Sequence, residues 1–195
     1  EHCLPNDKNI VEKPCNSCGL CFFINNEKGL CNDCIDYKIK KVHKEKEKAV
    51  GDFLKANGFL PIFEDKIIDS SCSKKRPDYV FDFNYLNIIV EVDENQHSSY
   101  ACECEQGRMI QIHQDFGGTP LLFIRFNPDT YIPEQGKSKE KINQRYKKLL
   151  ETLQGIKNYV SRNVWETPLT VCYLYYDRFG GIPEFIKLEY MEGQI

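Results

Sequence analysis

Two Cys-x2-Cys pairs constrain the start of this chain more than any other feature of its sequence. Cys15 and Cys18 form the first pair, Cys31 and Cys34 form the second, and twelve residues separate the two. Each pair presents two thiolates to one ion, so the four sulfurs can close a tetrahedral site. Few aliphatic side chains accompany these cysteines, and such a segment needs a metal in order to fold. The sequence therefore predicts a zinc-binding module at residues 1–35, with Zn²⁺ in a structural role.

The distribution of the ten cysteines favours metal ligation over disulfide bonds. Six of them lie in the first 34 residues, and the others are scattered. Cys-x2-Cys pairs beside an enzyme-like body are typical of an intracellular, reducing compartment such as the nucleus or cytoplasm. Three alternatives stay open: a pair formed by Cys18 and Cys21, a second site that includes His2 and Cys3, and a second metal at Cys102 and Cys104.

The rest of the chain, residues 36–195, predicts a mixed α/β domain. A helical stripe of apolar residues runs from about Asp36 and ends at Asn57-Gly58, a good stop signal. The apolar and aromatic runs Tyr79–Phe83 and Asn87–Val92 read as a hairpin with its turn at Asn84–Asn87. Further along we expect a helix at about 103–116, a strand at 121–126, a helix at 138–159 capped by Ser138, and strands at 169–176 and beyond 183, with a short strand at 67–68.

Composition excludes few functions. No run of about 18 apolar residues is present, so we expect no membrane-spanning helix. The net charge of −3 does not by itself indicate nucleic-acid binding. A nuclease can still be acidic overall, because its carboxylates hold metal while its cations lie in patches. Two lysine-rich stretches could be such patches or plain solvated helix faces: Lys38, Lys40, Lys41, Lys44, Lys46 and Lys48, and Lys137, Lys139, Lys141, Arg145, Lys147 and Lys148.

Acidic residues cluster around the predicted hairpin. Asp78 comes just before the first strand, and Glu91 and Asp93 lie near the end of the second. Because side chains alternate along a strand, Glu91 and Asp93 share one face while Val92 points to the other, into the core. Antiparallel pairing would bring Asp78 beside Glu91. Converging carboxylates repel one another, and Mg²⁺ or Mn²⁺ is the usual remedy for an all-oxygen site.

His97 lies a few residues beyond Glu91 and is placed to take a proton from a metal-bound water. The plainer alternative is an acidic turn at Asp93-Glu94-Asn95 with His97 on the surface. Arg125 interrupts the apolar run Leu121–Phe126. It could steady a phosphate at the open face of the sheet or pair with a core carboxylate.

These motifs resemble the PD-(D/E)XK nuclease superfamily. Pro77-Asp78 is followed thirteen residues on by Glu91, within the run Ile89-Val90-Glu91-Val92-Asp93-Glu94-Asn95-Gln96-His97. The likeness is greatest to the branch of very-short-patch repair endonucleases and small proteins with an I-E-V-D-G-x-x-H signature. It covers about residues 43–127 and implies a restriction-endonuclease-like mixed sheet flanked by helices, here preceded by a zinc-ribbon-like module.

The resemblance also implies roles for individual residues. Asp78, Glu91 and the Val92 carbonyl would bind Mg²⁺ or Mn²⁺, His97 would transfer a proton, and an acidic residue on the first helix would assist them. Glu47 matches that last position best, with Glu45 as the fallback. Two departures stand out. Asp93 replaces the usual lysine, so His97, Gln96 or the metal must fill its role, and Glu94 replaces a glycine.

A metal-dependent endonuclease that hydrolyses DNA phosphodiester bonds is the function these residues favour. The expected partner is double-stranded DNA, with a homodimer left open and no membrane involved. The alternatives are a non-catalytic, zinc-containing nucleic-acid-binding module on a degenerate nuclease fold, and a protein-interaction domain. Asp78, Glu91 and His97 together favour the enzyme, because a binding protein does not need them. The expected contacts to nucleic acid are Lys40, Lys41, Lys44, Arg108 and Arg125.

Overall fold

The computed structural model of the chain describes residues 12–14, 21–23, 29, 37–66, 75–97 and 102–188. The side chains at 12–14, 21–23, 37–44, 95, 97 and 102–104 are outside that description. The chain divides into two compact units, residues 1–45 and 46–195. The division falls between Glu45 and Lys46, inside a helix.

The first unit contains a small antiparallel hairpin. Its strands are β1 (Glu12–Pro14) and β2 (Cys21–Phe23), paired so that Lys13 lies opposite Phe22. The sequence does not show this hairpin, because strands of three residues are too short to display alternation. The predicted zinc ligands Cys15, Cys18, Cys31 and Cys34 lie outside the described residues.

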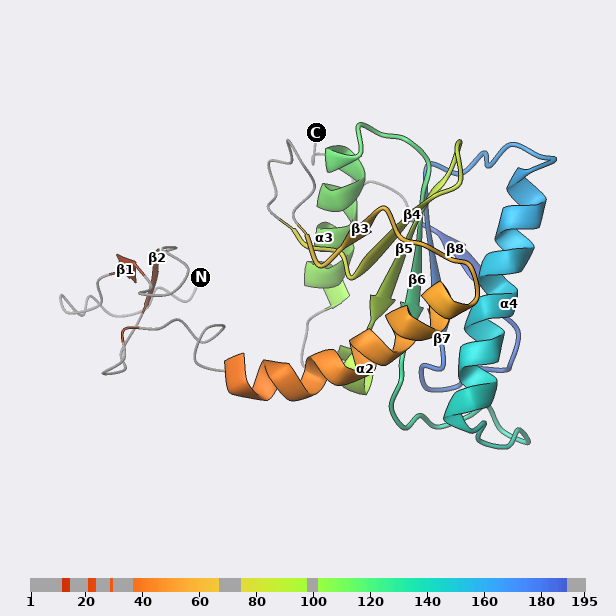
Figure 1. Cartoon of the computed structure of the whole chain (residues 1–195), viewed down its shortest axis with the longest axis horizontal. Coiled ribbons are helices and arrows are strands. Elements are labelled where there is room, and N and C mark those ends of the chain that lie inside the picture. Colours follow the sequence, from red (N-terminus) through yellow and green to blue (C-terminus); the bar gives the residue numbers. More distant parts are fainter. Residues whose placement is uncertain are drawn as a thin grey trace. The chain divides into compact units, whose positions relative to one another are not determined.

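The second unit is built around a six-stranded mixed sheet (Figure 1). Its strands are β3 (Phe63–Glu64), β4 (Tyr79–Asp82), β5 (Asn87–Val92), β6 (Leu121–Phe126), β7 (Leu169–Leu174) and β8 (Phe185–Lys187). The strands lie side by side in chain order. β5, β6 and β7 run parallel, whereas the other neighbouring pairs run antiparallel. The mixed sheet agrees with the expected α/β class.

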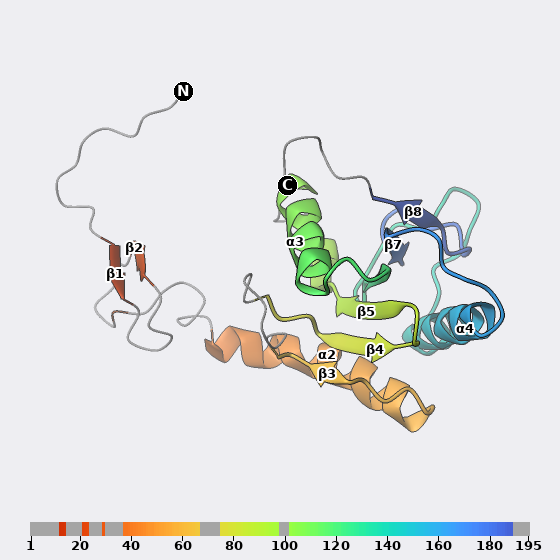
Figure 2. The same ribbon diagram turned by 90° about the horizontal axis from the view of Figure 1, so that it is seen from above.

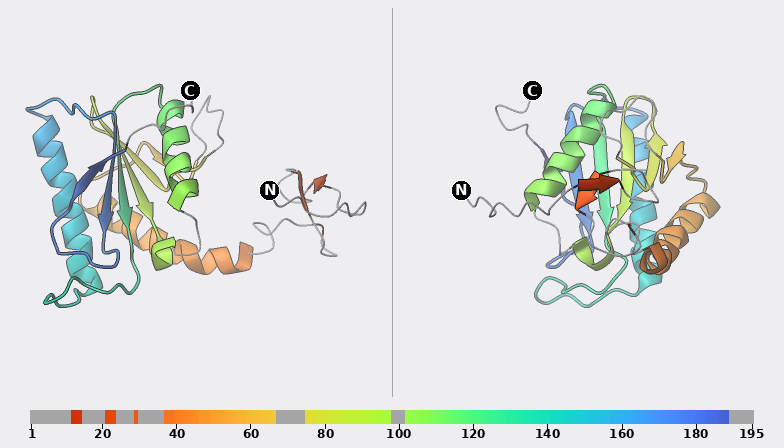
Figure 3. Two further views of the ribbon diagram at one scale, coloured as in Figure 1. Left: turned by 180° about the vertical axis from the view of Figure 1, so that it is seen from behind. Right: turned by 90° about the vertical axis from the view of Figure 1, so that its left-hand side faces the viewer.

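Helices cover both faces of this sheet. The helix α3 (Cys102–Asp115) lies on one face, while α2 (Tyr37–Ala56) and α4 (Ile142–Val160) lie on the other (Figures 2 and 3). Each face has its own apolar core. Met109 and Ile112 of α3 pack on Ile89 and Phe123, while the larger core on the opposite face joins Val50, Leu54, Val90, Ile124, Leu149 and Leu153. Among the described residues no helix is long and apolar enough to cross a membrane.

Most of the expected elements form where the sequence placed them, with one helix start wrong. The hairpin β4–β5 and strand β6 match their predicted runs. Helix α4 begins at Ile142 and its N-cap is Lys141, so Ser138 does not cap it. Before it, Lys141 has an extended backbone, and the Glu140 backbone N–H donates to the Tyr131 hydroxyl at 3.2 Å. The predicted strand at 67–68 falls outside the described residues.

Helix α2 approaches β4 so closely at one point that only glycine fits. A methyl group on Gly51 would collide with the ring and hydroxyl of Tyr79. That hydroxyl donates to the Glu47 carbonyl at 2.9 Å. The contact joins α2 to the strand that begins next to Asp78.

Gly51→Ala is therefore expected to destabilise the protein by about 1–3 kcal/mol, because the added methyl overpacks the interface. The matched control is Gly155→Ala in α4, where a methyl meets nothing within 4 Å. There the better helix propensity of alanine should stabilise the protein by up to about 1 kcal/mol. Thermal melts of both variants check this, and shifts of the same sign would contradict it.

Candidate active site

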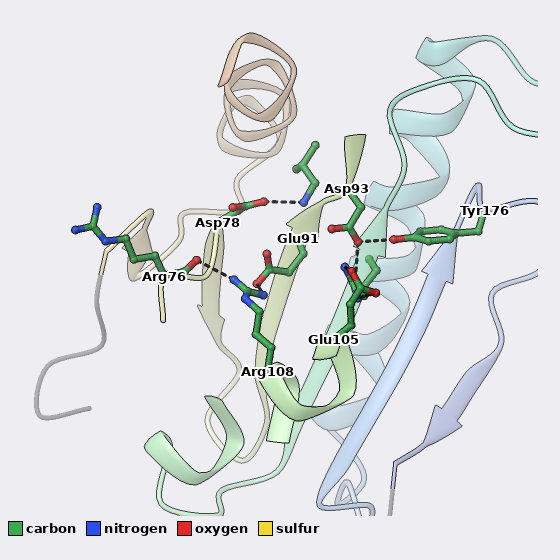
Figure 4. Close-up of polar contacts among 9 residues, drawn as sticks. Arg76, Asp78, Glu91, Asp93, Glu105, Arg108 and Tyr176 are labelled. Atoms are coloured by element: carbon green, nitrogen blue, oxygen red, sulfur yellow. Dashed lines mark hydrogen bonds and ion pairs between the residues drawn. The ribbon is translucent and has the colours of Figure 1, made fainter. Parts of the chain in front are cut away.

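The antiparallel hairpin brings Asp78 to the end of β5. Tyr79 pairs with Val90, so the residue before Tyr79 comes level with Glu91. Asp78 Oδ2 accepts a hydrogen bond from the Val92 backbone N–H at 2.7 Å (Figure 4). The convergence expected from the sequence is confirmed: Asp78, Glu91 and the backbone of Val92 lie together.

Alternation along β5 places the acidic residues as expected. Val92 belongs to the core packed by α2 and α4. Glu91 faces α3 on the opposite side of the sheet, where Arg108 Nη1 donates to Glu91 Oε1 at 2.8 Å. Asp93 lies on that side too and is fully buried. Glu91 and Asp93 thus form a carboxylate row on the α3 face.

Negative charge accumulates around Asp78. Burial in the first place, and then the charges of Glu91, Glu47 and Asp93, raise the pKa of Asp78 well above its usual range, although the Val92 N–H opposes the shift. Burial also raises the pKa of Glu91, against the neighbouring charge of Arg108. Glu47 of α2 therefore lies near enough to act on Asp78, which agrees with its expected place at the site.

Asp93 belongs to a buried network of its own. Its Oδ2 accepts from Arg125 Nε at 2.6 Å and from the Tyr176 hydroxyl at 2.5 Å. Arg125 also donates a hydrogen bond from each terminal nitrogen to the Glu105 carboxylate of α3, at 2.5 and 2.8 Å. The charge of Asp93, after burial, raises the pKa of Tyr176. The Asp93 side chain is thus held by Arg125 of β6 and by Tyr176, which follows β7.

The structure decides between the two expected roles of Arg125. Its side chain is 4% exposed, and each guanidinium nitrogen bonds a carboxylate. A guanidinium that is buried and holds two carboxylates is not presented to a phosphate at the surface. Arg125 therefore pairs with core carboxylates, and its assignment as a nucleic-acid contact is corrected. Arg108, with a side chain 32% exposed, lies at the rim of the cluster.

Gln96 binds a neighbouring loop. Its Nε2 donates to Asp177 Oδ1 at 3.0 Å, and its Oε1 accepts from the Asp177 backbone N–H at 2.9 Å. This fixes the short helix η1 (Glu94–His97) to the segment after β7. His97 closes η1, but its side chain is outside the described part, as are those of Lys40, Lys41 and Lys44.

The carboxylates fit a hard divalent cation. Glu47, Asp78, Glu91, Asp93 and Glu105 gather near two guanidinium groups, Arg108 and Arg125, so negative charge is in excess. Among the described residues no three His, Cys, Asp or Glu side chains form a ready-made metal cluster. Magnesium needs fewer, because it is commonly bound through one or two carboxylates and keeps several waters. Asp78 and Glu91 therefore supply enough carboxylates for a magnesium site.

Sequence reasoning missed two members of the cluster, Glu105 and Tyr176, and it named Arg108 as a contact to nucleic acid without its pairing to Glu91. A signal existed for Glu105. Glu105 and Arg108 are three residues apart, so they share one face of α3, and Met109 and Ile112 on the neighbouring positions point into the core. Charged residues on a core-facing stripe indicate partners inside the protein. Nothing in the sequence singles out Tyr176.

The chain matches no protein-family model, no curated protein and no solved structure. The family resemblance of the Asp78 and Glu91 motifs stays a prediction.

Proposed function

We propose that this protein is a metal-dependent endonuclease that hydrolyses DNA phosphodiester bonds. The observation that carries the proposal is the meeting of Asp78 and Glu91 at the end of the β4–β5 hairpin, with excess negative charge around them. A fold gains nothing from gathering unneutralised carboxylates, so their convergence indicates a ligand that is itself positive.

Asp78, Glu91 and the Val92 carbonyl would hold Mg²⁺ or Mn²⁺. Such an ion, when bound, polarises a phosphate and lowers the pKa of a water molecule. Glu47 adds charge from α2, and His97 is the proposed proton acceptor. Asp93 is a positioning residue in this scheme, since Arg125 and Tyr176 fix it directly after Val92.

The proposed substrate is double-stranded DNA. The backbone of the nucleic acid would meet Lys40, Lys41 and Lys44 of α2, with Arg108 nearer the carboxylates. One centre cuts one strand at a time, so double-strand cleavage would call for two copies of the chain. A homodimer is proposed for that case.

The test is incubation of supercoiled plasmid and labelled oligonucleotides with the protein and Mg²⁺ or Mn²⁺. We expect nicking that EDTA abolishes and that Asp78→Ala and Glu91→Ala lose. Equal nicking by the variants and wild type would overturn the site. Metal binding without cleavage of any DNA or RNA would favour the alternative, a non-catalytic nucleic-acid-binding module.

The zinc proposal has its own test. Elemental analysis of the purified protein should find about one zinc per chain, because four thiolates form a closed structural site. Cys15→Ser/Cys31→Ser should lose that zinc, whereas Cys172→Ser, at a buried thiol of β7, should keep it. Wild-type protein without zinc would refute this part.

A further inference from the structure

Arg108 bonds one of the two acidic ligands proposed for the metal, Glu91, and feels the charge of the other, Asp78. From α3 its Nη1 donates to Glu91 Oε1 at 2.8 Å, and its Nη2 donates to the Arg76 carbonyl at 3.0 Å. Arg76 precedes Asp78 by two residues, so one guanidinium bridges β5 and the approach to β4 (Figure 4). The group stands at the site itself and is not a remote surface charge.

Arg108 and Arg125 bond different carboxylates. Arg125 donates hydrogen bonds to Asp93 and Glu105. Arg108 faces Glu91 and Asp78, whose charges raise the pKa of its guanidinium against the effect of burial. The charge of the Glu91–Asp78 pair is therefore balanced in part by Arg108.

The two arginines differ in how firmly they are held. Arg125 has a side chain 4% exposed and a bidentate carboxylate partner. Arg108 has a side chain 32% exposed and gives Glu91 a single hydrogen bond. Glu91 itself is buried, so Arg108 can leave it at small cost only where another cation takes its place at that carboxylate.

A guanidinium and a divalent cation compete for the same carboxylate. Arg108 occupies Glu91 Oε1, and two positive groups beside one carboxylate repel one another. Binding of the metal through that oxygen therefore requires Arg108 to move away. Its position at the rim keeps the freed guanidinium within the site.

We propose that Arg108 is an exchangeable counter-ion: it neutralises Glu91 in the metal-free protein, yields the carboxylate to the metal, and then binds the DNA phosphate. The inference rests on the proposed function and extends it. The guanidinium suits the second role, because it can donate two parallel hydrogen bonds to phosphate oxygens. The device keeps the acidic site folded without metal and supplies a phosphate-binding cation once metal arrives.

The experiment measures Mn²⁺ binding by calorimetry, without DNA, for wild type, Arg108→Ala, Arg108→Lys and Arg162→Ala. Arg162 follows α4 and is exposed, so its removal changes the net charge equally but leaves the site intact. Competition predicts that Arg108→Ala lowers the Mn²⁺ Kd about tenfold, since a positive neighbour is lost. Arg108→Lys keeps the charge, so its Kd should stay closer to that of wild type.

Cleavage at saturating Mn²⁺ tests the second half. Arg108→Ala should cut plasmid about tenfold or more slowly despite tighter metal binding, because a charge-assisted contact to phosphate is lost. Tighter binding with unchanged cleavage would overturn the phosphate role. A Kd for Arg108→Ala that equals or exceeds that of wild type and Arg162→Ala would overturn the counter-ion role, as would equal tightening by Arg108→Lys.

The outcomes separate this inference from the proposed function. If no protein cleaves but Arg108→Ala binds Mn²⁺ tighter, the counter-ion role stands and the endonuclease proposal fails. If wild type cleaves and Arg108→Ala leaves the Kd unchanged, the reverse holds. Absence of Mn²⁺ binding in every protein overturns both. Circular dichroism establishes that each variant is folded, with Arg108→Gln as the substitute should Arg108→Ala unfold.

Discussion

Arg125→Ala is expected to lower the free energy of unfolding by about 3–5 kcal/mol, because it leaves buried carboxylates without their cation. Asp93 is fully buried and would retain only the Tyr176 hydroxyl among the partners described above. Glu105 would lose both of its hydrogen bonds to the guanidinium. For a chain of this size such a loss corresponds to a fall in Tm of roughly 10 °C.

Thermal and urea melts measure the effect, with Arg162→Ala as the exposed control. A second variant identifies its cause. Arg125→Met/Asp93→Asn removes the cation and one buried charge together, so it should be more stable than Arg125→Ala. A loss below about 1 kcal/mol for Arg125→Ala, within the range of exposed ion pairs, would mean that the network is not buried in solution.

Asp78→Asn is expected to slow cleavage strongly and yet to make the metal-free protein more stable. The asparagine can still accept the hydrogen bond from the Val92 N–H. It removes a charge that lies near Glu91, Glu47 and Asp93. Cleavage should fall by about a hundredfold or more, as when a group that stabilises developing charge is lost.

The pH dependence gives the sign of the stability effect. The pKa of Asp78 is raised in the folded protein above its ordinary value of 3.8. Folding therefore favours the protonated carboxyl, and stability is lost as the pH rises from the ordinary value through the folded pKa. In EDTA, the Tm of Asp78→Asn should be close to that of wild type at about pH 4 and higher than that of wild type at pH 7. A variant less stable than wild type at pH 7 would contradict the charge excess.

The sequence predicted the hairpin and its acidic ends correctly, because both depend on local pattern. Aromatic and β-branched runs around a polar turn define β4 and β5, and antiparallel pairing leaves little choice of register. From that register alone Asp78 falls beside Glu91, and alternation sends Glu91 and Val92 to opposite faces. The same logic placed β6 and the end of α2.

Local pattern failed where a residue's surroundings came from distant segments. Arg145 was grouped with a lysine-rich helix face, but it is buried and donates to the carbonyls of Asn127, Pro128 and Asp129. Gln96 was expected at the reaction centre, yet its amide holds Asp177, 81 residues away. A polar side chain on an amphipathic element looks alike in sequence whether it meets water or a partner.

The acidic centre at Asp78 and Glu91 was thus determined by the sequence itself, through strand pairing between neighbours in the chain. Only the tertiary structure decided which cation meets which carboxylate. Arg108 joins Glu91 across 17 residues, Arg125 joins Asp93 across 32, and Tyr176 joins Asp93 across 83. The physical reason is that periodicity reports which face a side chain takes, whereas these contacts depend on how α3, β6 and the segment after β7 pack around that face.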